Sequence, residues 1–188
     1  MTARWVVDVV QPARDLQVTW QPISLLFKNE PPEDSEYFAP AEHTHKLLRV
    51  FESVNAAEGN QAAFQFYWEA GRNIHHDDSL YVEPGTILTN AGLDASHSSA
   101  YEDDGWDSII REKMDEGLAL VGPDVGTPII SFGTPDGKIG IFGPVISRAP
   151  QGEEGLALWD AMVTMSTMDG FWELKRTRSE RPNFGERP

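Results

Sequence analysis

Four of the five histidines lie in two close groups. Of all features of the sequence, these groups have the residue types that most suggest chemistry. His43 and His45 are two residues apart, and the run His75–Asp78 places two histidines beside two aspartates. Side chains at positions i and i+2 do not share a helix face, and a structural metal site needs a closed ligand set at defined spacing. We therefore interpret both groups as structural and predict no metal site.

The sequence offers no recognisable nucleophile. It contains no cysteine, so disulfides, thiolate metal sites and cysteine nucleophiles are excluded for these 188 residues. Ser131 has no histidine placed to activate it, and there is neither a Gly-rich phosphate loop nor a G-x-S-x-G elbow. These patterns predict no catalytic residue.

Composition and charge limit the classes of partner. The formal net charge is −15, whereas nucleic acids and anionic membrane surfaces require a cationic patch, so neither is an expected partner. The sequence contains no run of about 18 apolar residues, so no transmembrane helix is expected. Asp8 cuts the short apolar run Trp5–Val7, which argues against a signal peptide. A hydrophobic share of 40% is sufficient for a sizeable core.

The stretch Asp124–Phe132 is predicted to leave a turn and begin a short apolar strand. Pro128 stands at the start of that strand, and because proline cannot donate to a β ladder, it marks an edge, a bulge or a special turn. Gly133–Gly137 has the composition of a hairpin turn. Lys138–Phe142 is the expected return strand, so the segment is predicted to be a β-hairpin.

The other elements are predicted from hydrophobic periodicity and from helix signals. We expect a helix over Thr2–Gln11, a strand over Leu16–Leu25, a loop over Asn29–Pro40, a mainly helical block over 41–120 and a last helix over Gly152–Met168. Within the helical block, Pro84 is expected to open a helix and Asp94 to cap another. The tail from Lys175 is expected to be partly ordered at best. This order indicates an α/β protein with a parallel strand pair joined through the helical block.

Motifs along almost the whole chain resemble one branch of a known superfamily. In chain order they are Thr2–Trp5, Arg14–Val18, Ile23–Leu25 with Asn29–Glu30, Gly71–His75, Val121–Pro128, Phe142–Ser147, Gly152–Glu154, Leu158–Asp160 and Phe171–Arg178. This ordered set resembles the DsbA-type branch of the thioredoxin superfamily, in particular the actinobacterial group that includes mycothiol-dependent nitroreductases. The match at Thr127–Pro128 resembles the cis-proline half of a thioredoxin-fold active site, which implies a cis bond there.

The resemblance implies an α/β, thioredoxin-like (DsbA-type) fold with a helical insertion domain. Residues 1–40 and 121–188 would form the thioredoxin-like core, and residues 41–120 the helical insertion domain. In this family a first strand and a Cys-Pro-Trp-Cys-type motif precede the helix that matches Thr2–Trp5, so the fold is expected to be N-terminally incomplete. Met1 would be either an internal methionine taken as the start, which we favour, or the start of a cysteine-free descendant.

The expected missing strand has a consequence for assembly. It would leave the strands that match Leu16–Leu25 and Thr127–Phe132 unpaired across a gap of roughly 9–10 Å. Buried backbone groups without partners are costly, and exposed strand edges recruit other chains. We rank a homodimer first among the outcomes; the others are direct pairing of the two flanking strands and a loosened first helix and strand.

The resemblance also implies a function. The protein would be a cytoplasmic oxidoreductase that uses mycothiol or a similar small thiol as co-substrate and needs no other cofactor. Thr127 and Pro128 would line the groove for a small-molecule thiol or disulfide substrate, and Asn29 and Tyr37 would form its wall. Because thiol–disulfide exchange needs a thiolate, the chain itself is expected to be inactive. The alternatives are a cysteine-free thioredoxin-fold binding module and an isomerase-like protein acting on glutathione adducts.

Overall fold

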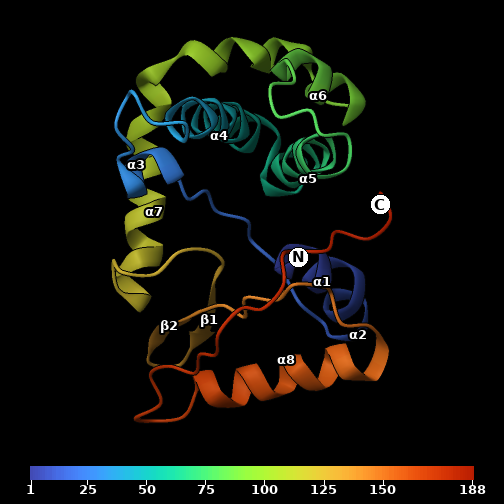
Figure 1. Ribbon diagram of the computed structural model, residues 1–188, viewed down its shortest axis with the longest axis vertical. Helices are drawn as coiled ribbons and strands as arrows, with labels where there is room; N and C mark the ends of the chain where they lie inside the picture. The colour runs from blue at the N-terminus through green and yellow to red at the C-terminus, as the bar shows by residue number, and fades with distance from the viewer. The chain divides into compact units, whose positions relative to one another are not determined.

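The computed structural model describes residues 1–188, and its helices and strands fall into two units (Figure 1). Unit 1 comprises Met1–Val18 and Glu116–Gly185, and unit 2 comprises Thr19–Asp115 and Glu186–Pro188. Residues 19–40 therefore group with the helical block. The assignment of 1–40 and 121–188 to one domain and 41–120 to another stays a prediction.

Unit 1 begins with the expected helix, which continues beyond Gln11. It consists of α1 (Thr2–Trp5), a wider π-helical turn η1 (Val6–Val10) and α2 (Gln11–Ala13). Pro12 therefore lies inside the helix. A proline ring clashes with the carbonyl four residues earlier in a regular α-helix, and the wider π turn immediately before Pro12 changes the hydrogen-bond spacing at that point. The Gln11 N–H accordingly donates to the carbonyl of Val6, five residues earlier.

The core of unit 1 is formed where this helix packs against α8 (Gly152–Ser166), the last predicted helix. Trp5 is fully buried and meets Trp159 edge to face, with ring centroids 5.8 Å apart. Gly155 permits the close approach, because a Cβ atom there would lie 2.8 Å from Val9 Cγ1 and 2.7 Å from the carbonyl oxygen of Pro150. The Val9 side chain therefore packs directly on the backbone of α8 at this point.

The sheet of unit 1 is the predicted hairpin. Strand β1 (Ile129–Thr134) pairs antiparallel with β2 (Gly137–Phe142), and Ile129 lies opposite Phe142. The turn is tighter than predicted, since only Pro135 and Asp136 lie between the strands. Apolar side chains of both strands pack against the core that contains Trp5 and Trp159.

The predicted strand over Leu16–Leu25 is wrong, and so is the predicted parallel strand pair. The sheet contains only β1 and β2, so the expected flanking strands do not pair directly. Residues 16–24 join no ladder, and Leu25 begins helix α3 (Leu25–Asn29). Leu16 and Val18 still pack on the core of unit 1. Their alternation in the sequence therefore reflects one-sided packing of an unpaired segment.

Unit 2 is helical, as predicted for the block 41–120. After α3 it contains α4 (Phe38–Glu58), α5 (Asn60–His76), α6 (Pro84–Asn90), the 3-10 helices η2 (Ala95–Glu102) and η3 (Asp104–Trp106), and α7 (Asp107–Val121), which extends into unit 1. Its core contains Val50 and Val54 of α4 and Phe66 of α5. None of the helices in the protein is both long and apolar enough to cross a membrane.

The helix starts in unit 2 follow local signals. Asp94 caps η2 by accepting a hydrogen bond from the Ser96 N–H at 2.8 Å, as predicted, and Pro84 opens α6, also as predicted. The predicted loop over Asn29–Pro40 is wrong at both ends, because α3 includes Asn29 and α4 already begins at Phe38. Pro40 is tolerated there because the first-turn N–H groups of a helix have no intrahelical partner.

Candidate functional site

Two of the predicted site residues lie at the open end of the hairpin in unit 1. The Thr127–Pro128 bond is cis, which confirms the prediction, and the Gly143–Pro144 bond is cis as well. The carbonyl of Pro128 accepts a hydrogen bond from the Gly143 N–H at 2.8 Å, and that of Pro144 accepts one from the Thr2 hydroxyl at 2.7 Å. Thr127 is exposed, and no hydrogen bond within the chain engages its backbone.

The other two predicted site residues lie in unit 2, at the borders of helices. Asn29 is the last residue of α3 and is followed by Glu30 in the left-handed region, with φ 43°. Tyr37 directly precedes α4, and 69% of its surface is exposed. The structure thus describes Thr127 and Pro128 together in one unit and Asn29 and Tyr37 together in the other. Their common role in a groove stays a prediction.

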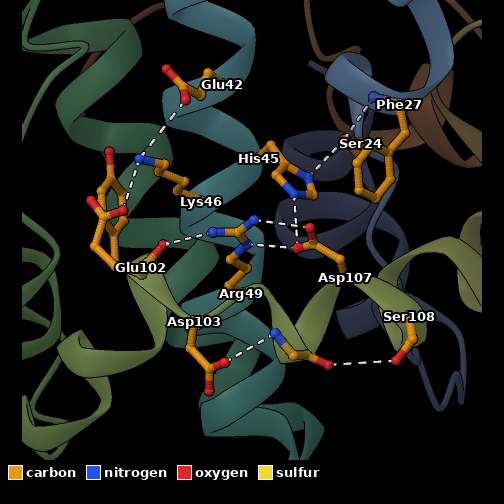
Figure 2. A network of polar contacts seen from close by, with 12 residues as sticks. Ser24, Phe27, Glu42, His45, Lys46, Arg49, Glu102, Asp103, Asp107 and Ser108 are labelled. Atoms are coloured by element: carbon orange, nitrogen blue, oxygen red, sulfur yellow. Dashed lines mark hydrogen bonds and ion pairs between the residues drawn. The ribbon is translucent and has the colours of Figure 1, made fainter.

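A polar cluster of unit 2 was not predicted from the sequence (Figure 2). His45 of α4 contacts the Ser24 hydroxyl through Nδ1 at 2.9 Å and Asp107 Oδ1 through Nε2 at 3.0 Å. Arg49, one helical turn further along α4, donates to both carboxylate oxygens of Asp107, at 2.6 and 2.9 Å. The cluster therefore links the start of α3, the middle of α4 and the start of α7.

By residue type, Ser24, His45 and Asp107 match a serine nucleophile, a base and a carboxylate. Burial excludes that reading, because Ser24 is completely buried and His45 is 2% exposed, whereas a nucleophile must reach a substrate. The Ser24 hydroxyl also accepts a hydrogen bond from the Phe27 N–H at 3.1 Å and so caps α3. The arrangement is suited to holding three helices together.

The hydrogen bonds favour a neutral His45. If Nε2 carries the proton, it donates to Asp107 while Nδ1 accepts from the Ser24 hydroxyl, so every polar atom of the ring is satisfied. Burial lowers the pKa of His45, and the guanidinium groups of Arg49 and Arg111 lower it further, although Asp107 acts in the opposite direction. Burial alone would raise the pKa of Asp107, but the hydrogen bonds from Arg49 and His45 and the charge of Arg49 outweigh it and lower that pKa.

These shifts predict how stability depends on pH. The pKa of His45 is lower in the folded protein than its ordinary value of 6.5, so the unfolded chain binds more protons between those two values. The contribution of His45 is therefore fully present above pH 6.5 and is lost as the pH falls toward the folded pKa. The slope from one such histidine is at most about 1.4 kcal/mol per pH unit.

The measurement is urea denaturation between pH 8 and pH 5. His45→Gln is expected to flatten the slope below pH 6.5, because glutamine offers a similar donor and acceptor but does not titrate. His97→Gln is the matched control, since it removes a histidine that bonds to Ser53 and Glu58 outside this cluster. An unchanged slope in His45→Gln would contradict a neutral, buried His45.

The second histidine of the sequence pair has different partners. His43 Nδ1 lies 2.6 Å from the Tyr101 hydroxyl, and burial lowers the pKa of His43. The two imidazoles thus bond to different residues, as expected for positions i and i+2. Nowhere in the 188 residues do three or more histidine, aspartate or glutamate side chains gather as a metal site would require.

A cleft of about 620 Å³ lies on unit 2 beside α6 and η2. Its lining is polar and acidic and consists of Glu83, Pro84, Gly85, Thr86, Ser98, Ser99, Tyr101 and Glu102. None of the four predicted substrate-binding residues belongs to this lining.

The comparison with protein families identifies the chain over most of its length. The family model described as "Rv2466c-like: Mycothiol-dependent nitroreductase Rv2466c" matches residues 1–176. The match includes the α1–α2 helix, unit 2 up to Asp115, the hairpin with both cis-prolines, and α8. The chain therefore belongs to the Rv2466c-like family of mycothiol-dependent nitroreductases.

Proposed function

We propose that this protein is a thiol-dependent reductase-like member of the DsbA-type thioredoxin superfamily, with a cytoplasmic role. The observation that carries the proposal is the family match over residues 1–176, because the family itself is one of mycothiol-dependent reductases. Mycothiol or a similar small thiol would be the co-substrate. The substrate groove would lie at the Thr127–Pro128 step of unit 1.

The surroundings of Thr127 support a groove at this position. The residue is exposed at the end of β1, beyond the last ladder pair Ile129–Phe142. Its N–H and C=O have no partner within the chain, so they can form the main-chain hydrogen bonds by which an extended ligand adds to a strand. A thiol with an amide backbone, placed in this way, would lie along the Thr127 backbone.

Because this chain contains no cysteine, it would bind a thiol without performing the redox step. Thiol–disulfide exchange proceeds by attack of a thiolate on a disulfide sulfur, and these 188 residues contain no cysteine. The same observation favours a second candidate function, in which the chain is a thiol-binding module that performs no redox step. Both candidates predict the same groove.

We expect binding without turnover. With dithiothreitol as reductant, the 188-residue protein should reduce a disulfide substrate no faster than the blank. Titration with mycothiol, followed by amide chemical shifts, should perturb Thr127 and leave Thr134, at the far end of β1, unchanged.

Two results would contradict this proposal. Disulfide reduction above the blank would show chemistry that does not depend on a protein thiolate. Shift changes confined to the acidic cleft beside α6, with none at Thr127, would place the thiol site elsewhere.

A further inference from the structure

We propose that Ser53, His97 and Glu58 form a reactive-serine site, in which Ser53 accepts the acyl group of an activated ester. This trio of side chains belongs to unit 2, where α4 contacts η2, and shares no residue with the buried cluster around His45. The inference goes beyond the proposed thiol-dependent function and does not depend on it, because it involves none of the four residues predicted for the substrate groove.

Two hydrogen bonds join the three side chains of the trio. The Ser53 hydroxyl lies 2.7 Å from His97 Nδ1, and His97 Nε2 lies 3.1 Å from Glu58 Oε1. Because a carboxylate can only accept a hydrogen bond, Nε2 carries the proton of a neutral imidazole and Nδ1 accepts from the Ser53 hydroxyl. The order of hydroxyl, imidazole and carboxylate is that of a serine nucleophile, its general base and the group that orients the base. Compared with the Ser-His-Asp triad, the two ring nitrogens exchange partners, but one still accepts and the other still donates.

The trio is positioned by helices. Ser53 lies near the end of α4, and Glu58 is the last residue of that helix. His97 is the third residue of η2, and its N–H donates to the carbonyl of the capping residue Asp94 at 3.3 Å. Side chains on helices are held more precisely than side chains on loops, so the two hydrogen bonds of His97 are part of a defined arrangement.

Access to solvent distinguishes this trio from Ser24, His45 and Asp107, which have matching residue types. Ser53 is partly exposed, and the His97 side chain is 13% exposed. Ser24, in contrast, is completely buried, and its hydroxyl accepts a hydrogen bond from a backbone N–H as the cap of α3. The Ser53 hydroxyl has His97 as its partner and caps no helix. A nucleophile must reach its substrate, and of these two serines Ser53 meets that condition.

The chemical step that this arrangement supports is acyl transfer to Ser53. The Ser53 oxygen attacks the carbonyl carbon of the ester while its proton passes to His97 Nδ1, and the carboxylate of Glu58 stabilises the imidazolium that forms. The tetrahedral adduct then expels the leaving group, which takes the proton back from Nδ1. One C–O bond forms and one breaks, so the products are acyl-Ser53 and a free alcohol, and no oxidant or reductant is required.

The surroundings of Ser53 restrict the acyl donor. The N–H groups of a helix interior are engaged in helical hydrogen bonds, so those of α4 beside Ser53 do not form an oxyanion hole. The donor therefore needs a leaving group that departs readily, as in an aryl ester. Unit 2 contains 19 acidic and 7 basic residues, a net charge of −12, which disfavours anionic donors. The expected substrates are neutral or cationic activated esters.

Acetylation by p-nitrophenyl acetate, followed by peptide mass spectrometry over time, tests the proposal. In the native protein we expect an acetyl group on Ser53 and none on the buried Ser24. His97→Gln should slow the acetylation of Ser53 by about 10²-fold, the lower end of the range for general base catalysis. Glu58→Gln should slow it by less, because the amide oxygen can still accept from Nε2 although the charge is lost.

Ser99→Ala is the matched control. Ser99 is an exposed serine of η2 whose hydroxyl donates to the Ser96 carbonyl at 3.0 Å and has no histidine partner. This variant should leave the acetylation of Ser53 unchanged. In the unsubstituted protein Ser99 should react about 10²-fold more slowly than Ser53, because it lacks a general base. Circular dichroism confirms that each variant is folded.

Three results would overturn the proposal. Acetylation confined to amino groups would show that the trio contains no nucleophile. Equal rates at Ser53 and Ser99 would show that His97 does not activate Ser53. Acetylation of Ser53 that is as fast in His97→Gln as in the unsubstituted protein would leave the hydrogen bonds of His97 with the structural role of joining η2 to α4.

Discussion

Trp5→Ala is expected to lower the free energy of unfolding by about 3–5 kcal/mol, the range for truncating a large buried aromatic side chain. Trp5 is completely buried between the first helix and α8. The substitution removes the edge-to-face contact with Trp159, whose ring centroid lies 5.8 Å away, and the hydrogen bond from the indole N–H to the Gly155 carbonyl at 3.1 Å.

Urea denaturation combined with hydrogen–deuterium exchange measures this effect, because exchange reports separately on unit 1 and unit 2. Protection should fall in α1 and α8 and persist in α4 and α5. Trp172→Ala is the matched control, since this tryptophan is 89% exposed; at high salt it should change stability by less than about 0.5 kcal/mol. Equal effects of the two substitutions would mean that Trp5 is not at the centre of the unit 1 core.

Trp5→Phe separates packing from the hydrogen bond. Phenylalanine keeps most of the apolar volume but removes the indole N–H, so the Gly155 carbonyl loses its side-chain donor. We expect a cost of roughly 1–3 kcal/mol, the range for leaving a buried polar group without its partner. A cost as large as that of Trp5→Ala would assign most of the effect to the hydrogen bond.

The elements that the sequence predicts are those governed by local signals. The apolar stripe with Leu47, Phe51 and Val54 identifies α4 because the helical period of 3.6 places these residues on one buried face. Asp94 and Pro84 mark helix starts through interactions within a few residues. The hairpin is predicted because its turn residues stand next to its strands.

The predicted strand over Leu16–Leu25 is wrong because strand formation also depends on distant parts of the chain. Alternating side chains show that a segment has a buried side, but a strand also requires a partner for its backbone. No segment of the described chain supplies that partner. Periodicity cannot reveal this, because pairing is decided by residues far away in the sequence.

The polar cluster around His45 likewise joins residues that are far apart in the sequence. His45 is 21 residues from Ser24 and 62 residues from Asp107. The sequence shows His45 only as a neighbour of His43, which lies on another side of the helix and bonds to Tyr101. A signal was nevertheless present, since His45 and Arg49 are separated by four residues and therefore share a face of α4.

Asp107→Ala is expected to cost about 1–3 kcal/mol, the range for leaving a buried polar group without its partner, since the pair is only partly buried and the Asp107 side chain is 28% exposed. The Arg49 side chain is 11% exposed and would keep its charge without the carboxylate that now accepts two of its hydrogen bonds. His45 would lose the acceptor of its Nε2 proton as well. Hydrogen exchange should show the loss where α4 meets the start of α7, while the core of unit 1 stays protected.

Two further variants test whether the unpaired charge of Arg49 is the cause. Asp115→Ala, on the exposed side of the same helix, should change stability by less than about 0.5 kcal/mol. Adding Arg49→Met to Asp107→Ala should recover part of the loss, because replacing both partners of a buried pair by apolar groups costs less than leaving one charge alone. The coupling energy of this double-mutant cycle should exceed about 1 kcal/mol. If Arg49→Met and Asp107→Ala were simply additive, the stability of unit 2 would not depend on this pair, and Asp107 would act only through His45.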